Sequence, residues 1–404
     1  MTNEEFIHRY CTEDVQRLAL LKAPEGVDMK FCLQQIEGWQ TATRKLPMWS
    51  ETEGVLYPPR LSMEQCSSEE TARYKQQLVC RILSEDKRLS MVDLTGGFGI
   101  DFSYLAKEFR EATYVEKQEI LCRMALHNMP LMGLGLAHIV QSDCMEYVKE
   151  MPMTNLVFMD PARRDSTGRK TVALQDCTPD VRQLVPQLMS HTDLLLLKLS
   201  PMLDITQAVR ELPDVREVHI VSVNDECKEL ILALQPNTCE HIVYHCVNLG
   251  KHEQYFQCEG CAFEPKLSEL PQGYLYEPNV SILKAGVQDA LCDIYRVKKL
   301  HPYSHLFTSD ICKKEFPGRI FQLDGFSGFG KTELKSLIGD LKQANLPIRN
   351  FPSTVAELRK RLRLQEGSDV YLFATTLKDG RHALLRCSKI TLESPAVRVE
   401  GPLV

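Results

Sequence analysis

A short glycine-rich stretch offers the clearest chemistry in the sequence. Residues 92–101 read Val-Asp-Leu-Thr-Gly-Gly-Phe-Gly-Ile-Asp, between a run of strand-forming residues and a segment with helical spacing, 102–109. Glycines at such a turn let a ligand lie against bare backbone at the start of a helix. We therefore predict that a bound ligand is held by Asp93, Thr95, Gly96, Gly97, Phe98 and Gly99.

Two acidic residues follow this loop at the ends of the next predicted strands. Glu116, which precedes Lys117, lies 23 positions after Asp93 (116 minus 93), where a carboxylate can accept both hydroxyls of a ribose. Asp143, which precedes Cys144, ends the following strand and is expected to meet an adenine amino group. The two acids and the loop therefore outline a pocket for an adenosine, and we predict that Lys117 and Cys144 also bind this ligand.

The glycine spacing of the loop argues against a dinucleotide. Gly96, Gly97 and Gly99 lack the further glycine, three positions on, of the pattern G-x-G-x-x-G. A pyrophosphate is therefore the weaker interpretation. Asp93 at the entrance of the loop favours a ligand with a cationic amino-acid group.

A second polar group follows the fourth predicted strand, 156–159. Asp160 and the carbonyl of Pro161 can hold an amine, and group transfer to an aligned lone pair needs little beyond such positioning. Arg163, which we assign to the catalytic group, and Arg164, which we assign to substrate binding, either grip phosphate or pair with local acids. Both alternatives stay open.

The elements that must position these residues alternate between short apolar runs and helical segments. This order is typical of an α/β fold with a Rossmann-like, doubly wound parallel sheet. A further run, 229–234, follows the preceding strand after a link too short for a helical crossover, so we expect it to be antiparallel. The predicted parallel strands are 90–94, 112–116, 138–141, 156–159, 194–199 and 217–223.

The predicted fifth strand, 194–199, brings two more residues to the same rim of the sheet. Lys198 and Ser200 fall at its carboxyl end and are predicted to bind substrate. For Lys198, a charge that reaches out from a buried strand is an equally good interpretation.

The loop, its acids and the antiparallel strand resemble the class I S-adenosylmethionine-dependent methyltransferases over residues 75–235. Thr95 stands where that family has its first glycine. The residues from Asp160 onward are similar to the Asp/Asn-Pro-Pro-aromatic motif of amino-methylating enzymes, but Ala162 and Arg163 replace the second proline and the aromatic ring. The ring expected to stack on a flipped base is therefore missing.

The C-terminal half resembles a bacterial, Bacteroidetes-type methyltransferase family with a ferredoxin-like segment and a THUMP-like domain. The resemblance rests on residues 274–279, 285–286, 349–352 and 357–364. THUMP domains bind RNA, so it implies an RNA substrate, with Arg359, Lys360, Arg361 and Arg363 as candidate phosphate contacts. We expect an N-terminal helical unit at 1–88 and a methyltransferase domain with an added β hairpin at 89–272. Two small α+β parts then follow, the ferredoxin-like segment at 273–323 and the THUMP-like domain at 324–404.

Two further motifs suggest chemistry that their surroundings do not support. Residues 325–332 match the phosphate-loop pattern G-x-x-x-x-G-K-[ST], but too little chain follows for the parallel strands and the magnesium-binding acid of such a domain. The cysteines and histidines of 239–261 include one CxxC pair, and strand alternation would send His245 and Cys246 to opposite faces. We therefore assign no metal ligands, and whether the cluster of 239–261 binds a metal stays open.

Composition and charge limit the remaining classes. The 404 residues carry a net charge of −6, yet 325–404 hold 13 basic and 8 acidic residues, a balance of +5 that suits local contact with a polyanion. The 15 scattered cysteines, the acidic start and the lack of a long apolar run favour a cytoplasmic protein without a membrane span. The oligomeric state stays open.

These features together predict an S-adenosylmethionine-dependent methyltransferase that acts on RNA, with a base amino group as one candidate acceptor. One alternative keeps the pocket but methylates a small molecule or a protein, which the missing aromatic ring favours. The other is an RNA adaptor that binds the cofactor without turnover.

Overall fold

The computed structural model describes residues 1–163, 173–236, 241–260, 263–391 and 397–400. Contacts divide the chain into two compact units, one formed by 1–216 and 231–238 and the other by 217–230 and 239–404. Among the described helices, not one combines the length and the apolar character that crossing a membrane requires.

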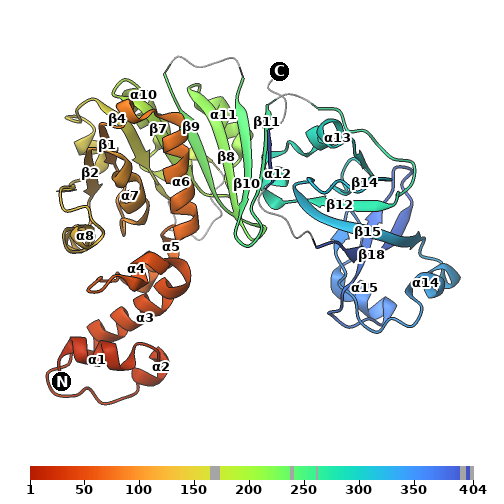
Figure 1. Cartoon of the computed structure of the whole chain (residues 1–404), viewed down its shortest axis with the longest axis horizontal. Helices are drawn as coiled ribbons and strands as arrows, with labels where there is room; N and C mark the ends of the chain where they lie inside the picture. Colours follow the sequence, from red (N-terminus) through yellow and green to blue (C-terminus); the bar gives the residue numbers. More distant parts are fainter. Residues whose placement is uncertain (164–172, 237–240, 261–262, 392–396, 401–404) are drawn as a thin grey trace. The chain divides into compact units, whose positions relative to one another are not determined.

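The first unit begins with helices whose starts are set by local capping residues. Thr2 and Glu5 form a capping box, and the Ser68 hydroxyl accepts a hydrogen bond from the Thr71 amide at 3.3 Å. The helices, red to orange in Figure 1, are α1 (Asn3–Tyr10), α2 (Val15–Leu18), α3 (Met29–Lys45), α4 (Pro47–Glu51), α5 (Arg60–Gln65) and α6 (Glu69–Ile82).

A parallel sheet follows, and it confirms the predicted α/β fold. Its order in the first unit is β7-β4-β1-β2-β3, and the central strands are buried almost throughout. The strands are β1 (Ser90–Asp93), β2 (Glu111–Glu116), β3 (His138–Gln141), β4 (Thr154–Met159) and β7 (Thr192–Leu199). The intervening helices are α7 (Ile100–Leu105), α8 (Glu119–Leu131), α9 (Cys144–Tyr147), α10 (Val181–Met189) and α11 (Ile205–Glu211).

Short elements complete the first unit. Strands β5 (Ala162–Arg163) and β6 (Cys177–Thr178) pair antiparallel with each other. The 3-10 turns are η1 (Glu85–Lys87), η2 (Ala106–Glu108) and η3 (Leu174–Asp176).

The predicted antiparallel strand forms a hairpin with the strand before it. β8 (Val215–Val223) and β9 (Glu226–Leu234) are joined by Asn224 and Asp225, whose φ angles are 50° and 63°. Two successive residues with positive φ make the tight turn that favours right-handed strand twist. Residues 231–234 of β9 extend the sheet of the first unit beside β7, while 217–230 belong to the second unit.

In the second unit, β8 continues into a sheet made by the predicted extra hairpin. β10 (Val243–Leu249) runs parallel to β8, and β11 (Gln254–Glu259) pairs antiparallel with β10. β19 (Val397–Glu400) adds parallel to β11, a pairing between distant segments that the sequence did not predict.

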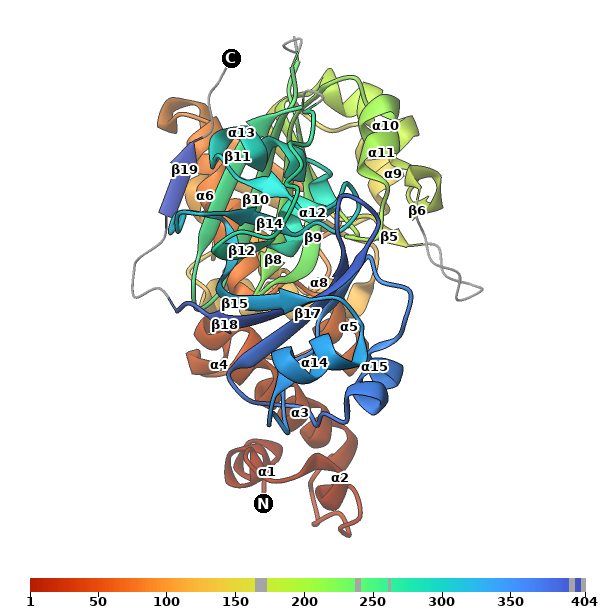
Figure 2. The ribbon, with the colours of Figure 1, turned by 90° about the vertical axis from the view of Figure 1, so that its right-hand side faces the viewer.

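A second sheet of the same unit carries the C-terminal segments, with the order β13-β14-β12-β15-β18-β17-β16. Leu372 and Ala374 pack with residues of α14 and α15 on one face, whereas Phe373 packs on the other, as strand alternation requires. Figure 2 shows these two helices near β17 and β18. The strands are β12 (Tyr274–Pro278), β13 (Lys298–Lys299), β14 (Phe307–Ser309), β15 (Gly318–Ser327), β16 (Ile348–Arg349), β17 (Val370–Thr376) and β18 (His382–Lys389). The helices are α12 (Val280–Ala285), η4 (Gln288–Ala290), α13 (Leu291–Ile294), α14 (Lys331–Ile338) and α15 (Val355–Leu362).

We predict that Gly38→Ala destabilises the first unit. Alanine favours a helix by about 1 kcal/mol over glycine, but a Cβ at Gly38 would lie 2.2 Å from the Cβ of Tyr57. Overpacking costs about 1–3 kcal/mol, so the steric term outweighs the helix propensity. Urea unfolding followed by tryptophan fluorescence measures this, because both tryptophans, Trp39 and Trp49, lie in this region.

The matched control is Thr43→Ala, at an exposed position of the same helix. It gains helix propensity without a clash and should leave the urea midpoint equal or slightly higher. A midpoint that rises for Gly38→Ala would contradict the predicted overlap.

Candidate functional site

The glycine loop between β1 and α7 keeps its shape through close packing of its own backbone. The Gly96 amide donates to the Val115 carbonyl at 2.9 Å, and a Cβ at Gly96 would lie 2.1 Å from the Tyr114 ring. Gly97 and Gly99 have φ angles of 54° and 88°, which favour glycine. The loop therefore requires glycine for steric reasons at one position and for backbone reasons at two.

Glu116 is tied to this loop from the end of the neighbouring strand β2. Its carboxylate accepts hydrogen bonds from the Gly97 amide at 3.0 Å and the Gln118 amide at 2.8 Å. Each carboxylate oxygen has a second lone pair, so both can still accept from a ligand hydroxyl. The structure thus brings together the loop and the acid that were predicted to share a ligand.

Asp93, at the end of β1, is a buried carboxyl group among other acids. Burial is the main cause that raises its pKa well above the ordinary value, and the charges of Asp101, Asp160 and Glu116 add to the effect. The Thr95 amide donates to Asp93 at 2.9 Å, which opposes the shift. A cation placed beside Asp93 would relieve this repulsion.

Thr95 joins the loop to the residue that follows β4. Its hydroxyl accepts a hydrogen bond from the Asp160 amide at 2.6 Å. The Asp160 carboxylate is 2.6 Å from the Lys198 ammonium at the end of β7. Threonine at this position therefore links two neighbouring parallel strands at their carboxyl ends, where the glycine of the related motif could not.

Asp101 on α7 is the centre of a buried ion cluster that extends from this rim. It accepts from the Ser67 hydroxyl at 2.7 Å and lies 3.1 Å from the Lys75 ammonium and 3.4 Å from the Lys198 ammonium. Burial alone would raise the pKa of Asp101, but the charges of Lys75 and Lys198 hold it below the ordinary value. The carboxylate is therefore ionised and paired.

Sequence reasoning missed Ser67, Lys75 and Asp101. Lys75 lies in an amphipathic stretch where a lysine is typical of a solvent-exposed face, and its burial depends on contacts that α6 makes with α7. Asp101 carried a weak signal, since it directly follows the glycine loop.

The remaining predicted cofactor residues occupy varied positions. Asp143 is exposed and caps α9 through a 2.9 Å bond from the Met145 amide. Beside it, burial raises the pKa of the Cys144 thiol to about 11. Lys117 is exposed, whereas Phe98 is buried, with ring centroids 4.8 Å from Trp49.

The other predicted substrate residues are placed only in part. Pro161 is buried and Ser200 is half-buried, with its hydroxyl accepting from the Met202 amide at 3.2 Å. The side chain of Arg163 and the whole of Arg164 lie outside the described residues.

The predicted basic residues lie on α15 and at its end. Arg359 is half-buried and donates to the Ala344 carbonyl at 3.2 Å. Lys360, Arg361 and Arg363 are exposed, and Arg363 directly follows the last residue of the helix. The Arg361 guanidinium also lies 5.3 Å from the Phe329 ring centroid.

The phosphate-loop pattern of 325–332 is part of an antiparallel arrangement. The neighbours of β15 in the second sheet, β12 and β18, both run antiparallel to it. The Gly330 amide, which a phosphate would need, donates to Glu333 of α14 at 3.1 Å. This geometry is not that of a phosphate-loop domain.

The comparisons with known proteins match most of the chain. The crystal structure of a proposed methyltransferase from Porphyromonas gingivalis W83 has 31% identity and a TM-score of 0.85, over 96% of this chain and 98% of that one. Residues 274–317 match the family described as a ferredoxin-like domain, and 318–389 match the family described as THUMP domain-like. No curated protein matches the chain.

Two weaker matches each cover less than half of the chain. A proposed RNA methyltransferase from Pyrococcus horikoshii has 14% identity and a TM-score of 0.33, over 48% of this chain and 98% of its own. TrmK from M. capricolum, in complex with S-adenosylhomocysteine, has 12% identity and a TM-score of 0.31, over 41% of this chain and 69% of its own.

We predict that Asp101→Asn lowers the free energy of unfolding of the first unit by about 1.5–3 kcal/mol. The substitution preserves shape but removes the charged acceptor between Lys75 and Lys198, while Lys198 keeps its pair with Asp160, so the loss is that of hydrogen bonds to a charged group. Urea unfolding followed by tryptophan fluorescence measures the loss.

The control for this substitution is Glu146→Gln, which breaks the exposed pair with Lys149 in the same unit. An exposed pair contributes less than about 1 kcal/mol. Equal losses in the free energy of unfolding for the two variants would contradict the prediction that the buried cluster around Asp101 stabilises the unit more than an exposed ion pair does.

Proposed function

The chain belongs to the bacterial methyltransferase family that joins a ferredoxin-like and a THUMP-like domain to a Rossmann-like sheet, and from that premise we propose that it methylates RNA with S-adenosylmethionine as the donor. The observation that carries the proposal is the contact of the Gly97 amide with Glu116 beside the buried Asp93. Glu116 offers acceptors for ribose hydroxyls, and Asp93 offers a counter-charge for a cation. Both residues lie at the carboxyl ends of neighbouring parallel strands.

The residues at this rim fit the donor in three respects. Gly97 of the loop is only half-buried, although Gly96 and Gly99 are buried, and Glu116 retains acceptor capacity. Burial is the main cause of the raised pKa of Asp93, and a cation bound beside this carboxyl group would lower that pKa. We assign the amino-acid part to Asp93, Thr95, Gly96, Gly97, Phe98 and Gly99, the ribose to Glu116 and Lys117, and the adenine to Asp143 and Cys144.

When bound, S-adenosylmethionine supplies an electrophilic methyl group on a positively charged sulfur. Asp160 is half-exposed and held by Lys198 on one side and by Thr95 through its backbone on the other. A carboxylate in this position accepts an N–H bond and thereby orients an amine lone pair, the main requirement of such a transfer. We assign the acceptor to an amino nitrogen, held by Asp160 and the Pro161 carbonyl.

The proposal that the acceptor is RNA is supported by the C-terminal part of the chain. Residues 318–389 match a THUMP-like family, and 325–404 carry a net charge of +5. Lys360 and Arg363 are exposed and suited to phosphate contacts. Arg361 is exposed as well, whereas the half-buried Arg359 would contribute mainly by shaping this surface.

We predict that S-adenosylmethionine binds more tightly as pH rises. The free protein holds a proton on Asp93 up to an unusually high pH, and a bound cation lowers that pKa, so binding releases the proton. The dissociation constant should fall by up to about tenfold per pH unit until the free carboxyl has ionised, and then level off. Calorimetric titrations at several pH values, in buffers of different ionisation enthalpy, measure the affinity and the proton release.

Asp93→Asn should weaken binding and remove the pH dependence. The control is Asp143→Asn, which alters an exposed carboxylate and should keep the slope of the wild type. A wild-type affinity that is flat with pH would contradict the assignment of Asp93 to the cation.

We expect methyl transfer to RNA to be detectable directly. The purified full chain is incubated with methyl-labelled S-adenosylmethionine and total RNA from cells that lack the protein. Acid-precipitable label should appear and be sensitive to nuclease. Asp160→Ala should abolish the label, by at least about 100-fold, while cofactor affinity stays within a few-fold of the wild type.

Two controls separate the alternatives. Glu150→Ala, at an exposed position before β4, should label RNA as the wild type does, and the double variant Lys360→Glu/Arg363→Glu should keep cofactor binding but lose label. Label that resists nuclease and is found in protein or in soluble compounds would move the acceptor to those classes. Cofactor binding without label in any fraction would favour the adaptor.

A further inference from the structure

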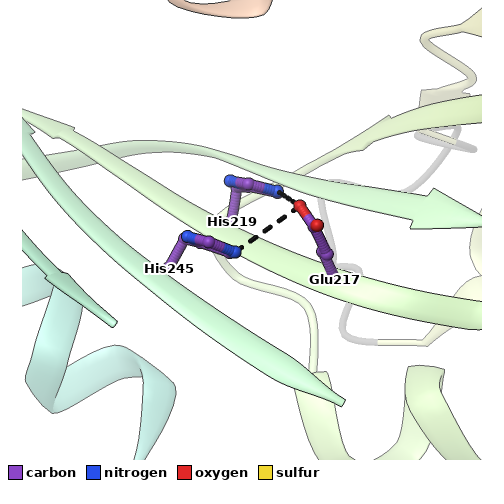
Figure 3. Close-up of side chains that lie close together, drawn as sticks. All are labelled: Glu217, His219 and His245. Atoms are coloured by element: carbon purple, nitrogen blue, oxygen red, sulfur yellow. Dashed lines mark hydrogen bonds and ion pairs between the residues drawn. The ribbon is translucent and has the colours of Figure 1, made fainter. Parts of the chain in front are cut away.

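Three potential metal ligands meet on one face of the sheet in the second unit. The Glu217 carboxylate lies 3.0 Å from Nε2 of His219 and 3.5 Å from Nε2 of His245. The potential ligand atoms of all three residues fall within 4.8 Å of one another. Figure 3 shows both rings directing a nitrogen toward the same carboxylate oxygen.

Strand geometry accounts for this convergence. Glu217 and His219 are two positions apart on β8, so their side chains leave the same face. His245 is the direct partner of His219 on the parallel strand β10. The pattern of two residues at i and i+2 with a third on the adjacent strand is thus a property of the backbone, and small side-chain rotations suffice to adjust it.

The cysteines of the cluster considered from sequence do not belong to this group. Cys246 is adjacent to His245 and therefore lies on the opposite face of β10. Cys258 of β11 pairs with Tyr244, which also belongs to that opposite face. Cys239 and Cys261 lie outside the described residues.

The ligand types and spacing suit a divalent transition metal. Zinc binds histidine nitrogen and carboxylate oxygen at about 2.0–2.2 Å, so neighbouring ligand atoms in a tetrahedron are roughly 3.4 Å apart. The two separations from Glu217, 3.0 and 3.5 Å, already bracket that value. We propose that Glu217, His219 and His245 form a binding site for a zinc-class divalent ion, with one further position for water or an exogenous ligand.

The two histidine rings lie face to face beside Glu217. They stack at a centroid distance of 4.4 Å with an angle of 6° between their planes. Neutral imidazole is the form that binds metals, and each ring must tilt from this nearly parallel stack for its Nε2 lone pair to meet a shared ion. One carboxylate beside two imidazoles also supplies negative charge to offset a cation in a buried site.

Direct metal titration of the full chain tests the proposal. The protein is dialysed against a chelator, and Zn²⁺ is titrated by calorimetry and by competition with a chromophoric chelator. One equivalent should bind, the unfolding temperature should rise by a few degrees, and protons should be released. Co²⁺ as a spectroscopic probe should give visible bands without the near-ultraviolet charge-transfer band of a thiolate ligand.

Conservative variants identify the ligands. Glu217→Gln and His245→Gln should each lower Zn²⁺ affinity by about 100-fold or more, and circular dichroism of the metal-free proteins checks that they fold. His252→Gln, an exposed histidine of the same unit, is the matched control and should bind as the wild type does. The absence of a stoichiometric site, unchanged affinity in both ligand variants, or a thiolate band with Co²⁺ would each overturn the proposal.

Discussion

The buried carboxylate of Asp101 is the interaction on which the arrangement of the candidate site depends. It lies on α7, directly after the glycine loop, and holds Lys75 of α6 and Lys198 of β7 within 3.4 Å. A charge buried this deeply is tolerated only when it is paired, so the three elements that supply the charges must keep one relative position. Lys198 in turn contacts Asp160, which carries the constraint to the end of β4.

The glycine loop obeys a second, complementary constraint, which is steric rather than electrostatic. Tyr114 packs against Gly96 and donates its hydroxyl to the Gly97 carbonyl, so the second strand supports the loop that follows the first. Glu116, two residues further on, then accepts from the Gly97 amide. Tyr114 and Glu116 are two positions apart on β2, so their side chains lie on the same face of the strand. Tyr114 supports the backbone of the loop, and Glu116 offers hydrogen-bond acceptors beside it.

The sequence was sufficient for features that depend on local spacing. The parallel strands were evident from buried apolar runs, the hairpin from the short link at Asn224 and Asp225, and the loop from its glycines. It was not sufficient where side chains meet through tertiary packing. Lys75 reads as a solvent-exposed residue, and its burial against Asp101 depends on how α6 and α7 pack.

Pairing between strands set a similar limit. Histidines at 219 and 245 become neighbours only through the register of β8 and β10, which no local pattern specifies. The contact of β19 with β11, between residues far apart in the chain, was missed for the same reason.

The hydrogen bond from the Asp160 amide to the Thr95 hydroxyl restrains the glycine loop and Asp160 relative to each other. The strands β1 and β4 already pair side by side, and this bond adds a side-chain contact beyond the last residues of that pairing. A displacement of the loop would therefore strain this bond as well as the sheet, which limits changes in the distance between the loop and Asp160.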